Sequence, residues 1–274
     1  MRYRLCIEYD GSNYSGWQRQ GHGLSIQEAI EESILKFSGE RVELVGSGRT
    51  DAGVHALGQV AHFDLVRGQF STPTIVQALN YYLCEFSRAR SGRMGSLIRR
   101  EFGDFYRRYG SLSGQDIVIK SCEEVDDGFH ARFSSRMRYY KYILVNTKSA
   151  SALWYARAWH VREPLDLGPM QTACQLLLGS HDFSSFRDSQ CQAPSPVKTL
   201  RSCTVHRNGD LISIEMAAKS FLHHMVRNIV GTLKDVGSHR TSIEEFRAII
   251  ESKDRRRAGV NAPAQGLYFI GVDY

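Results

Sequence analysis

No hydrophobic run in this chain of 274 residues approaches the ~20 residues that a membrane-spanning helix needs. The first eleven residues, MRYRLCIEYDG, combine two arginines with a strict alternation of apolar and polar residues, which does not resemble a secretory signal. We therefore expect a cytoplasmic protein with no membrane partner.

The six cysteines are scattered, and no two of them form a C-x-x-C pair. Zinc sites and redox motifs need closer spacing, so we expect reduced thiols that pack as small apolar groups. The adjacent His223 and His224 are poor joint metal ligands on a helix, where neighbouring side chains point ~100° apart. We expect no metal.

Motifs for bound nucleotides and for serine hydrolases are missing as well. The chain has no Walker phosphate loop and no G-x-G-x-x-G, and it has no G-x-S-x-G. Neither a nucleotide nor a hydride cofactor is implied.

Lysine is scarce, with 8 lysines against 27 arginines in a chain of net charge +6. Arginine presents a planar fork that matches phosphate and a face that stacks on bases. Such a balance favours a nucleic-acid partner. A solvated basic surface without a partner explains the composition equally well.

Apolar periodicity and turn residues predict an alternation of strands and helices. Strands are expected at 3–9, 41–45, 58–65, 115–125, 138–147 and 266–274, with a hairpin through Asn208-Gly209 within 201–218. Helices are expected at 25–38, 71–83, 169–178, 221–236 and 242–253. This mixture favours an α+β fold with a mainly antiparallel sheet. Residues 1–124 and 125–274 carry comparable sets of elements, so we expect two α/β domains.

Residues 85–110 interrupt this pattern with seven arginines against three acidic residues. Glycine, serine and arginine are concentrated at both ends of the segment. It is typical of an exposed insertion, and charged runs of this kind are often only solvated surface.

The stretch VGSGRTDAGVH, residues 45–55, places glycines around Arg49 and Asp51. Glycine permits unusual backbone angles and close approach of a ligand, and loops held by strands often carry function. In an extended chain Arg49 and Asp51 point the same way, and the arginine would keep the carboxyl ionised as a nucleophile or base. A structural turn with a local ion pair explains the same residues, so both interpretations stay open.

Two further segments carry polar or aromatic side chains at regular spacing. On a strand, Tyr140 and Tyr142 share one face and Tyr139 takes the other. Aromatic sheet faces bind RNA bases, although tyrosine is also common as half-buried strand filler. In HHMVRN, a helix would place His223 and Arg227 one turn apart, on a face that lines a cleft or is simply solvated.

The segment GRTDAGVHA, residues 48–56, closely resembles the catalytic motif of the TruA-type tRNA pseudouridine synthases. Eight further segments are similar to that family's blocks and follow in the same order. They are IEYDGSNYSGWQRQ, SIQEAIEESI, GQVAHF, FHARFSS, YYKYILVN, DFSSFR, FLHHMVRNIVG and GLYFIGVDY. The resemblance extends over nearly the whole chain.

This resemblance implies an enzyme that isomerises uridine to pseudouridine at positions 38, 39 and 40 of the tRNA anticodon stem-loop. Asp51 would be the catalytic carboxylate, with Arg49 filling the space left by an everted base. Tyr140 would contact the uracil and Leu267 would wall its pocket, with Arg227 and His223 also at the substrate. The reaction breaks the N1–C1′ bond and joins C5 to C1′, so nothing is added and no cofactor is needed.

The fold implied by the resemblance is two ferredoxin-like (RRM-like) α/β halves that form a continuous, mainly antiparallel sheet with a central basic cleft. The family works as a homodimer, with one tRNA reaching across both subunits. Two alternatives stay open: a pseudouridine synthase with another RNA target, and a tRNA-binding or chaperone protein without catalysis.

The chain departs from the family at the insertion. Where the family runs from an N-A-N-L-P turn directly to D-I, this chain has LNYYL, the basic segment and only then GQDI. We hypothesise that residues 85–110 form an extra tRNA-contacting arm. Charge reversal of Arg99, Arg100, Arg107 and Arg108 is then expected to weaken tRNA binding and flatten its salt dependence. Titration of labelled tRNA at several salt concentrations tests this. Unchanged affinity would show that the segment has no role in tRNA binding.

Overall fold

The computed structural model describes residues 1–21, 23–67, 69–90 and 115–274. The basic insertion expected at residues 85–110 lies, from residue 91 onward, outside the described residues. Across the described ranges, no helix is both long and apolar enough to cross a bilayer.

Internal contacts divide the chain into two compact units. The first unit comprises Met1–Ala52 and Ala56–Ser134, and the second comprises Gly53–His55 and Ser135–Tyr274. The domain boundary expected between residues 124 and 125 stays a prediction.

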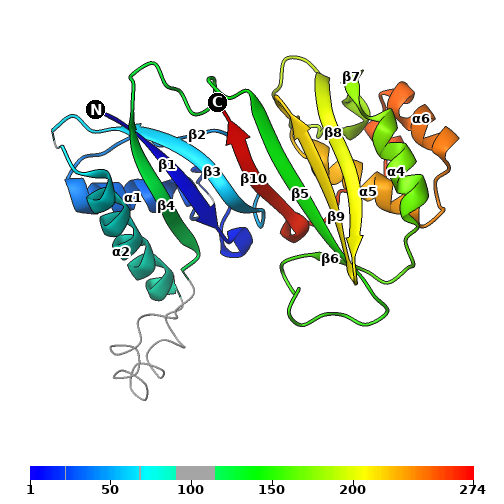
Figure 1. Ribbon diagram of the computed structural model, residues 1–274, viewed down its shortest axis with the longest axis horizontal. Coiled ribbons are helices and arrows are strands. Elements are labelled where there is room, and N and C mark those ends of the chain that lie inside the picture. The colour runs from blue at the N-terminus through cyan, green and yellow to red at the C-terminus, as the bar shows by residue number, and fades with distance from the viewer. Residues whose placement is uncertain (22, 68, 91–114) are drawn as a thin grey trace. The chain divides into compact units, whose positions relative to one another are not determined.

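The described part of the first unit combines antiparallel strands with two helices (Figure 1). Its strands are β1 (Arg2–Tyr9), β2 (Val45–Gly46), β3 (His55–Asp64) and β4 (Ile117–Val125), and its helices are α1 (Ile26–Ser38) and α2 (Thr72–Arg90). The long strands pair in the order β4-β1-β3, and β2 pairs with β3. Within this unit the strand order follows the ferredoxin-like pattern that the resemblance implied.

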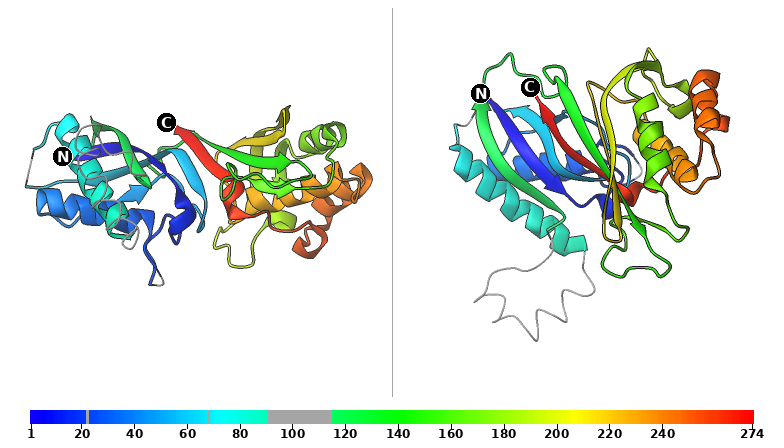
Figure 2. Two further views of the ribbon diagram at one scale, coloured as in Figure 1. Left: turned by 90° about the horizontal axis from the view of Figure 1, so that it is seen from below. Right: turned by 45° about the vertical axis from the view of Figure 1, so that its right-hand side comes forward.

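Alternation along β1 creates the apolar face of this sheet. Tyr3, Leu5, Ile7 and Tyr9 are buried, whereas the residues between them are half-buried. Helices α1 and α2 contact each other and lie on the same side of the strands (Figure 2). Helix α1 begins where the Ser25 hydroxyl accepts a hydrogen bond from the Glu28 amide, and it ends at the C-cap Gly39, whose φ is 73°.

The described part of the second unit is larger, and its sheet is also mostly antiparallel. Its strands are β5 (Met137–Asn146), β6 (Trp159–Val161), β7 (Gly179–Asp182), β8 (Val197–Asn208), β9 (Leu211–Ala218) and β10 (Leu267–Asp273), and its helices are α4 (Leu167–Leu176), α5 (Met225–Gly237) and α6 (Ile243–Ser252). The strands pair in the order β10-β5-β9-β8-β7, and the short β6 runs parallel to β5. The expected α+β class with mainly antiparallel strands is confirmed.

Helix α5 forms the centre of the second unit's core. It contacts α4, α6 and β5, and most of its residues are buried. Two glycines permit this packing. A β-carbon at Gly231 would lie 1.7 Å from the Val260 carbonyl oxygen, and one at Gly237 would lie 2.6 Å from the Met170 sulfur. The helix therefore lies directly against backbone, closer than any larger residue would allow.

Several element boundaries differ from the sequence-based expectations. The strand expected at 41–45 is wrong except at its end, because only Val45 and Gly46 pair with β3. Helix α2 continues past residue 83 to Arg90. The hairpin between β8 and β9 is confirmed, with Gly209 at φ 58° supplying the turn. The short strands β6 and β7 have no alternating pattern long enough to predict them.

His62 on β3 makes the first unit's stability depend on pH. Burial lowers the pKa of His62 to about 4, with Arg2 and His130 adding to the effect. Its Nδ1 accepts the amide hydrogen of Ala131 at 3.2 Å, which requires the neutral ring. From its ordinary value of about 6.5 down to about 4, the unfolded chain binds a proton that the folded chain does not. Stability therefore rises with pH through this window.

We expect His62→Gln, which keeps an acceptor but cannot titrate, to lose less thermal stability than the wild type when the pH falls from 6.5 to 4.5. Melting temperatures measured across this range test the prediction. Equal slopes for the two proteins would show that His62 makes no such contribution.

Candidate active site

The loop between β2 and β3 carries the motif GRTDAGVHA and is fixed at its first residues. The Ser47 amide donates to the Val60 carbonyl at 2.7 Å, and the Ser47 hydroxyl donates to the Gln59 side-chain oxygen at 2.7 Å. The Gln59 side-chain nitrogen in turn donates to the Gly48 carbonyl at 2.9 Å. Strand β3 therefore holds the start of the loop through both backbone and side chain.

Thr50 is held by the last residue of β1 and by the segment that follows this strand. Its carbonyl accepts the Trp17 amide hydrogen at 3.0 Å, and its hydroxyl lies 2.7 Å from the Tyr9 hydroxyl. Gly16, with φ 97°, allows this approach, since a β-carbon there would lie 2.6 Å from the Thr50 carbonyl oxygen. The residue before Asp51 is thus fixed at both its backbone and its side chain.

Asp51 follows Thr50 directly and is half-buried, at the start of a turn through Ala52 and Gly53. Gly53 has φ 79°, in the left-handed region that favours glycine. A half-buried carboxylate on a fixed loop keeps its access to solvent while its position is defined. This arrangement suits a side chain that must meet a substrate.

Arg49 is an exposed side chain on the same loop. Partial burial of the guanidinium lowers the pKa of Arg49, and the neighbouring Arg132 lowers it further. Arginine remains charged at physiological pH after such a shift. The loop therefore presents a cation two residues from the Asp51 carboxyl, with Arg132 as a second cation near the first. The pairing of Arg49 with Asp51 stays a prediction.

Tyr140 and Leu267 lie on neighbouring strands of the second unit, because β5 pairs with β10. The Tyr140 ring is only 9% exposed and meets Phe221 and Phe269 edge to face, at centroid distances of 5.0 and 5.1 Å. Leu267 is buried and pairs with Tyr142. As the sequence predicts, Tyr142 is buried with Tyr140 while Tyr139 faces outward. The surface formed by Tyr140, Tyr142 and Leu267 is apolar and aromatic, and such a surface can pack against a planar base.

Arg227 lies in the first turn of α5. Its Nε donates to the Ala262 carbonyl at 2.7 Å, and the Ala262 amide donates back to the Arg227 carbonyl at 3.2 Å. Burial raises the pKa of Tyr142, and the charge of Arg227 opposes that rise. The charge of Arg227 therefore acts on the ring of Tyr142, the residue that pairs with Leu267 across β5 and β10.

The prediction that His223 lies on the same helix as Arg227 is wrong. Helix α5 begins at Met225, and its N-cap His224 has a left-handed φ of 61°. The cause is Asp188, whose carboxylate lies 2.7 Å from His224 Nδ1 and 3.6 Å from His223 Nδ1. Holding both rings there, stacked at 3.9 Å, needs a chain turn that a helix does not offer.

Asn228, the residue after Arg227 in α5, is buried. Its side-chain nitrogen donates to the Phe186 carbonyl at 2.9 Å, and its oxygen accepts from Arg255 at 2.9 Å. This residue is a structural tie between α5 and its neighbouring segments. Nothing in the sequence of α5 alone distinguishes it from a solvated side chain.

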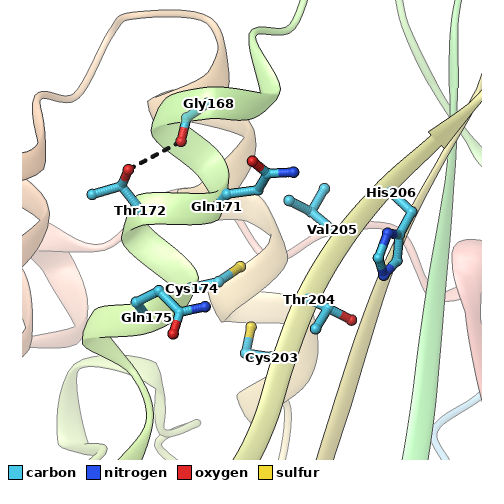
Figure 3. Close-up of a pocket in the computed structure, with 9 residues that line it drawn as sticks. All are labelled: Gly168, Gln171, Thr172, Cys174, Gln175, Cys203, Thr204, Val205 and His206. Carbon is cyan, nitrogen blue, oxygen red and sulfur yellow. Dashed lines mark hydrogen bonds between the residues drawn. The ribbon is translucent and has the colours of Figure 1, made fainter.

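An open pocket of about 400 Å³ lies elsewhere in the second unit, between α4 and β8 (Figure 3). It is lined by Gly168, Gln171, Thr172, Cys174 and Gln175 from the helix and by Cys203, Thr204, Val205 and His206 from the strand. None of the residues expected at the active site lines it, and its lining has no carboxylate. We assign no chemistry to this pocket.

Comparison with known proteins decides what these residues belong to. A family model described as tRNA pseudouridine synthase matches residues 5–91 and 173–274. A curated tRNA pseudouridine synthase A from Wolbachia pipientis wMel is 45% identical over 275 residues, covering 100% of both chains. A protein of the same name from Allorhizobium ampelinum is 45% identical over 273 residues, covering 100% of this chain and 95% of its own.

This chain belongs to the tRNA pseudouridine synthase family. The TruA-type resemblance is confirmed, and the protein is an RNA pseudouridine synthase, an isomerase. The matched ranges include the loop with Arg49 and Asp51 as well as Arg227 and Leu267, whereas Tyr140 lies between them.

Sequence reasoning missed the polar residues that hold the synthase's motif loop. Tyr9 fits the apolar alternation of β1, so its hydroxyl gave no signal of a role. Gln59 is a polar residue that is 0% exposed within β3. A glutamine among apolar strand residues was the one available signal, because buried polar groups need partners.

Proposed function

We propose that this synthase isomerises uridine to pseudouridine in the anticodon stem-loop of tRNA, at positions 38, 39 and 40, with Asp51 as the catalytic carboxylate. The observation that carries the proposal is the fixed loop: residues 47, 48 and 50 are each hydrogen-bonded to the first unit's scaffold, and half-buried Asp51 follows directly. Because the loop is already ordered, the carboxylate can meet a base without the entropic cost of fixing a mobile loop.

The chemistry needs one ionised carboxylate and a base taken out of its stack. The N1–C1′ bond breaks, the uracil turns, C5 joins C1′, and the proton on C5 is transferred to N1, so the atoms balance without a cofactor. Arg49 fills the space that the everted nucleotide leaves and neutralises nearby phosphate. An enzyme that acts on a base inside a duplex must supply the free energy of unstacking that base in every turnover.

The second unit supplies contacts to the uracil and its backbone in this proposal. Tyr140 packs on the base, Leu267 walls the side of its pocket, and Arg227 binds phosphate or the uracil edge, with His223 nearby. The side chains of Tyr140 and Leu267 are already buried by their neighbours, so few side-chain rotamers need to be fixed when the base binds. The proposal further includes a cytoplasmic homodimer whose basic cleft takes one tRNA across both subunits.

The experiment is to incubate the purified protein with an unmodified tRNA transcript and to map pseudouridine at single-nucleotide resolution. Pseudouridine at positions 38, 39 and 40 supports the proposal. Modification only at other uridines would favour another RNA target, and tRNA binding without any pseudouridine would favour the noncatalytic alternative. A transcript with cytidine at these positions controls for stem-loop binding without reaction.

A further inference from the structure

A buried polar cluster lies beneath the motif loop, entirely within the first unit. We call Tyr9, Ser47, Thr50 and Gln59 the loop clamp. Tyr9 ends strand β1, Gln59 lies in β3, and the other two residues belong to the loop itself. All four side chains are buried. The loop clamp therefore connects two strands of the sheet to the residues on either side of Arg49.

The hydrogen bonds of the loop clamp form two arms, one at Tyr9 and one at Gln59. The Tyr9 hydroxyl lies 2.7 Å from the Thr50 hydroxyl, and Gln59 donates to Gly48 at 2.9 Å and accepts from Ser47 at 2.7 Å. Burial raises the pKa of Tyr9 well above its usual value, against hydrogen bonds with Thr50 and Gln59 that lower it. Tyr9 is therefore a neutral phenol that also interacts with Gln59, and the two arms of the clamp meet there.

Stability alone does not require polar groups at these positions. Apolar side chains of similar shape would fill the same space without the cost of burying hydroxyls and an amide. What a satisfied polar network adds is a unique geometry, since each hydrogen bond restricts distance and angle. The geometry fixed here is that of Thr50, the residue covalently joined to Asp51.

We propose that Tyr9 is a positioning residue for catalysis, which acts through the Thr50 hydroxyl to hold the Asp51 carboxylate in its reactive place. The inference rests on the proposed role of Asp51. Tyr9 touches neither the substrate nor the reacting atoms in this account. A displacement of a reacting group by ~1 Å lowers rates by ~100-fold in enzymes, so losing one buried hydroxyl contact is expected to affect the chemical step more than tRNA binding.

The chain offers a matched control for this test. Tyr3 lies on the same strand and the same face as Tyr9, and it is 0% exposed. Its hydroxyl contacts the Met1 sulfur at 3.2 Å and the Phe70 carbonyl at 3.3 Å, not the motif loop. Tyr3→Phe and Tyr9→Phe therefore remove the same atom from two buried rings on one strand, and only the second removes it from the loop clamp.

We expect Tyr9→Phe to lower single-turnover pseudouridine formation ~10- to 100-fold. Its KM for tRNA and its melting temperature should match those of Tyr3→Phe. If the rate falls no further than in Tyr3→Phe, or if KM rises in proportion to the loss, Tyr9 does not position the carboxylate. Wild type and Asp51→Asn run in parallel, so an inactive wild type or an active Asp51→Asn would count against the proposed function and not against this inference.

A second pair of variants tests the same contact from the loop side. Thr50→Val keeps the shape and removes the hydroxyl, whereas Thr50→Ser keeps the hydroxyl and removes a methyl group. We expect Thr50→Val to show the loss seen in Tyr9→Phe and Thr50→Ser to recover most of the rate. Equal activities in the two variants would overturn the proposal, and this comparison decides the matter if Tyr9→Phe does not fold.

Discussion

Replacing Asp51 by asparagine is expected to lower pseudouridine formation by on the order of 10⁴-fold or more, with tRNA affinity changed by no more than about threefold. The amide has nearly the same shape as the carboxylate, but it is neither a nucleophile nor a base at neutral pH. Because hydrogen bonds to the scaffold hold Thr50 and Gly48, the loop should keep its conformation in the variant.

Single-turnover assays with mapped tRNA, combined with filter binding, separate the two quantities. Asp126→Asn is the matched control, because it makes the same change at an exposed acidic residue of the same unit. The control should keep its wild-type rate. An Asp51→Asn protein that still formed pseudouridine at a tenth of the normal rate would falsify the catalytic role of this carboxylate.

Gly231→Ala is expected to destabilise the protein by about 3 kcal/mol or more, the upper end for overpacking a core. The added carbon would lie 1.7 Å from the Val260 carbonyl oxygen, and neither backbone can move away easily because α5 is buried on most sides. Alanine favours a helix over glycine by only about 1 kcal/mol, so the steric effect outweighs the gain.

The measurement is thermal unfolding, in which a loss of this size corresponds to a shift of roughly 6–12 °C. Gly128→Ala is the control, because Gly128 is exposed and a β-carbon there has no neighbour within 4 Å. Its melting temperature should change little. If Gly231→Ala melts together with the control, the packing of α5 against the Val260 segment is looser than described.

Local signals in the sequence predicted the regular elements well. The serine caps of α1 and α6, Gly39 after α1 and the hairpin turn at Gly209 depend on neighbouring residues, so short-range chemistry was sufficient. The start of α5 depends on Asp188, which lies 36 residues before His224. No pattern within α5 could have revealed that partner.

The candidate site also combines features that neighbouring residues reveal with features that depend on distant residues. The motif loop was recognised from residues 48–56 together with eight further segments in the family's order, and the family comparisons support that recognition. What holds the loop could not be predicted, because the Tyr9–Thr50 contact joins residues 41 positions apart. The prediction of a strand at 41–45 was wrong for a related reason. Its alternation is regular, yet only its last residue reaches a pairing partner, and pairing is set by distant chain.

Trp17 joins the segment that follows β1 to the segment that precedes Asp51, and Gly46 leaves room for its indole ring. A β-carbon at Gly46 would lie 2.5 Å from the Trp17 indole, and the amide of Trp17 bonds to Thr50. The segment after β1 and the segment before Asp51 are thus in contact both at Gly46 and at Thr50. A change at Trp17 therefore reaches the residue before Asp51 directly, through the hydrogen bond to the Thr50 carbonyl.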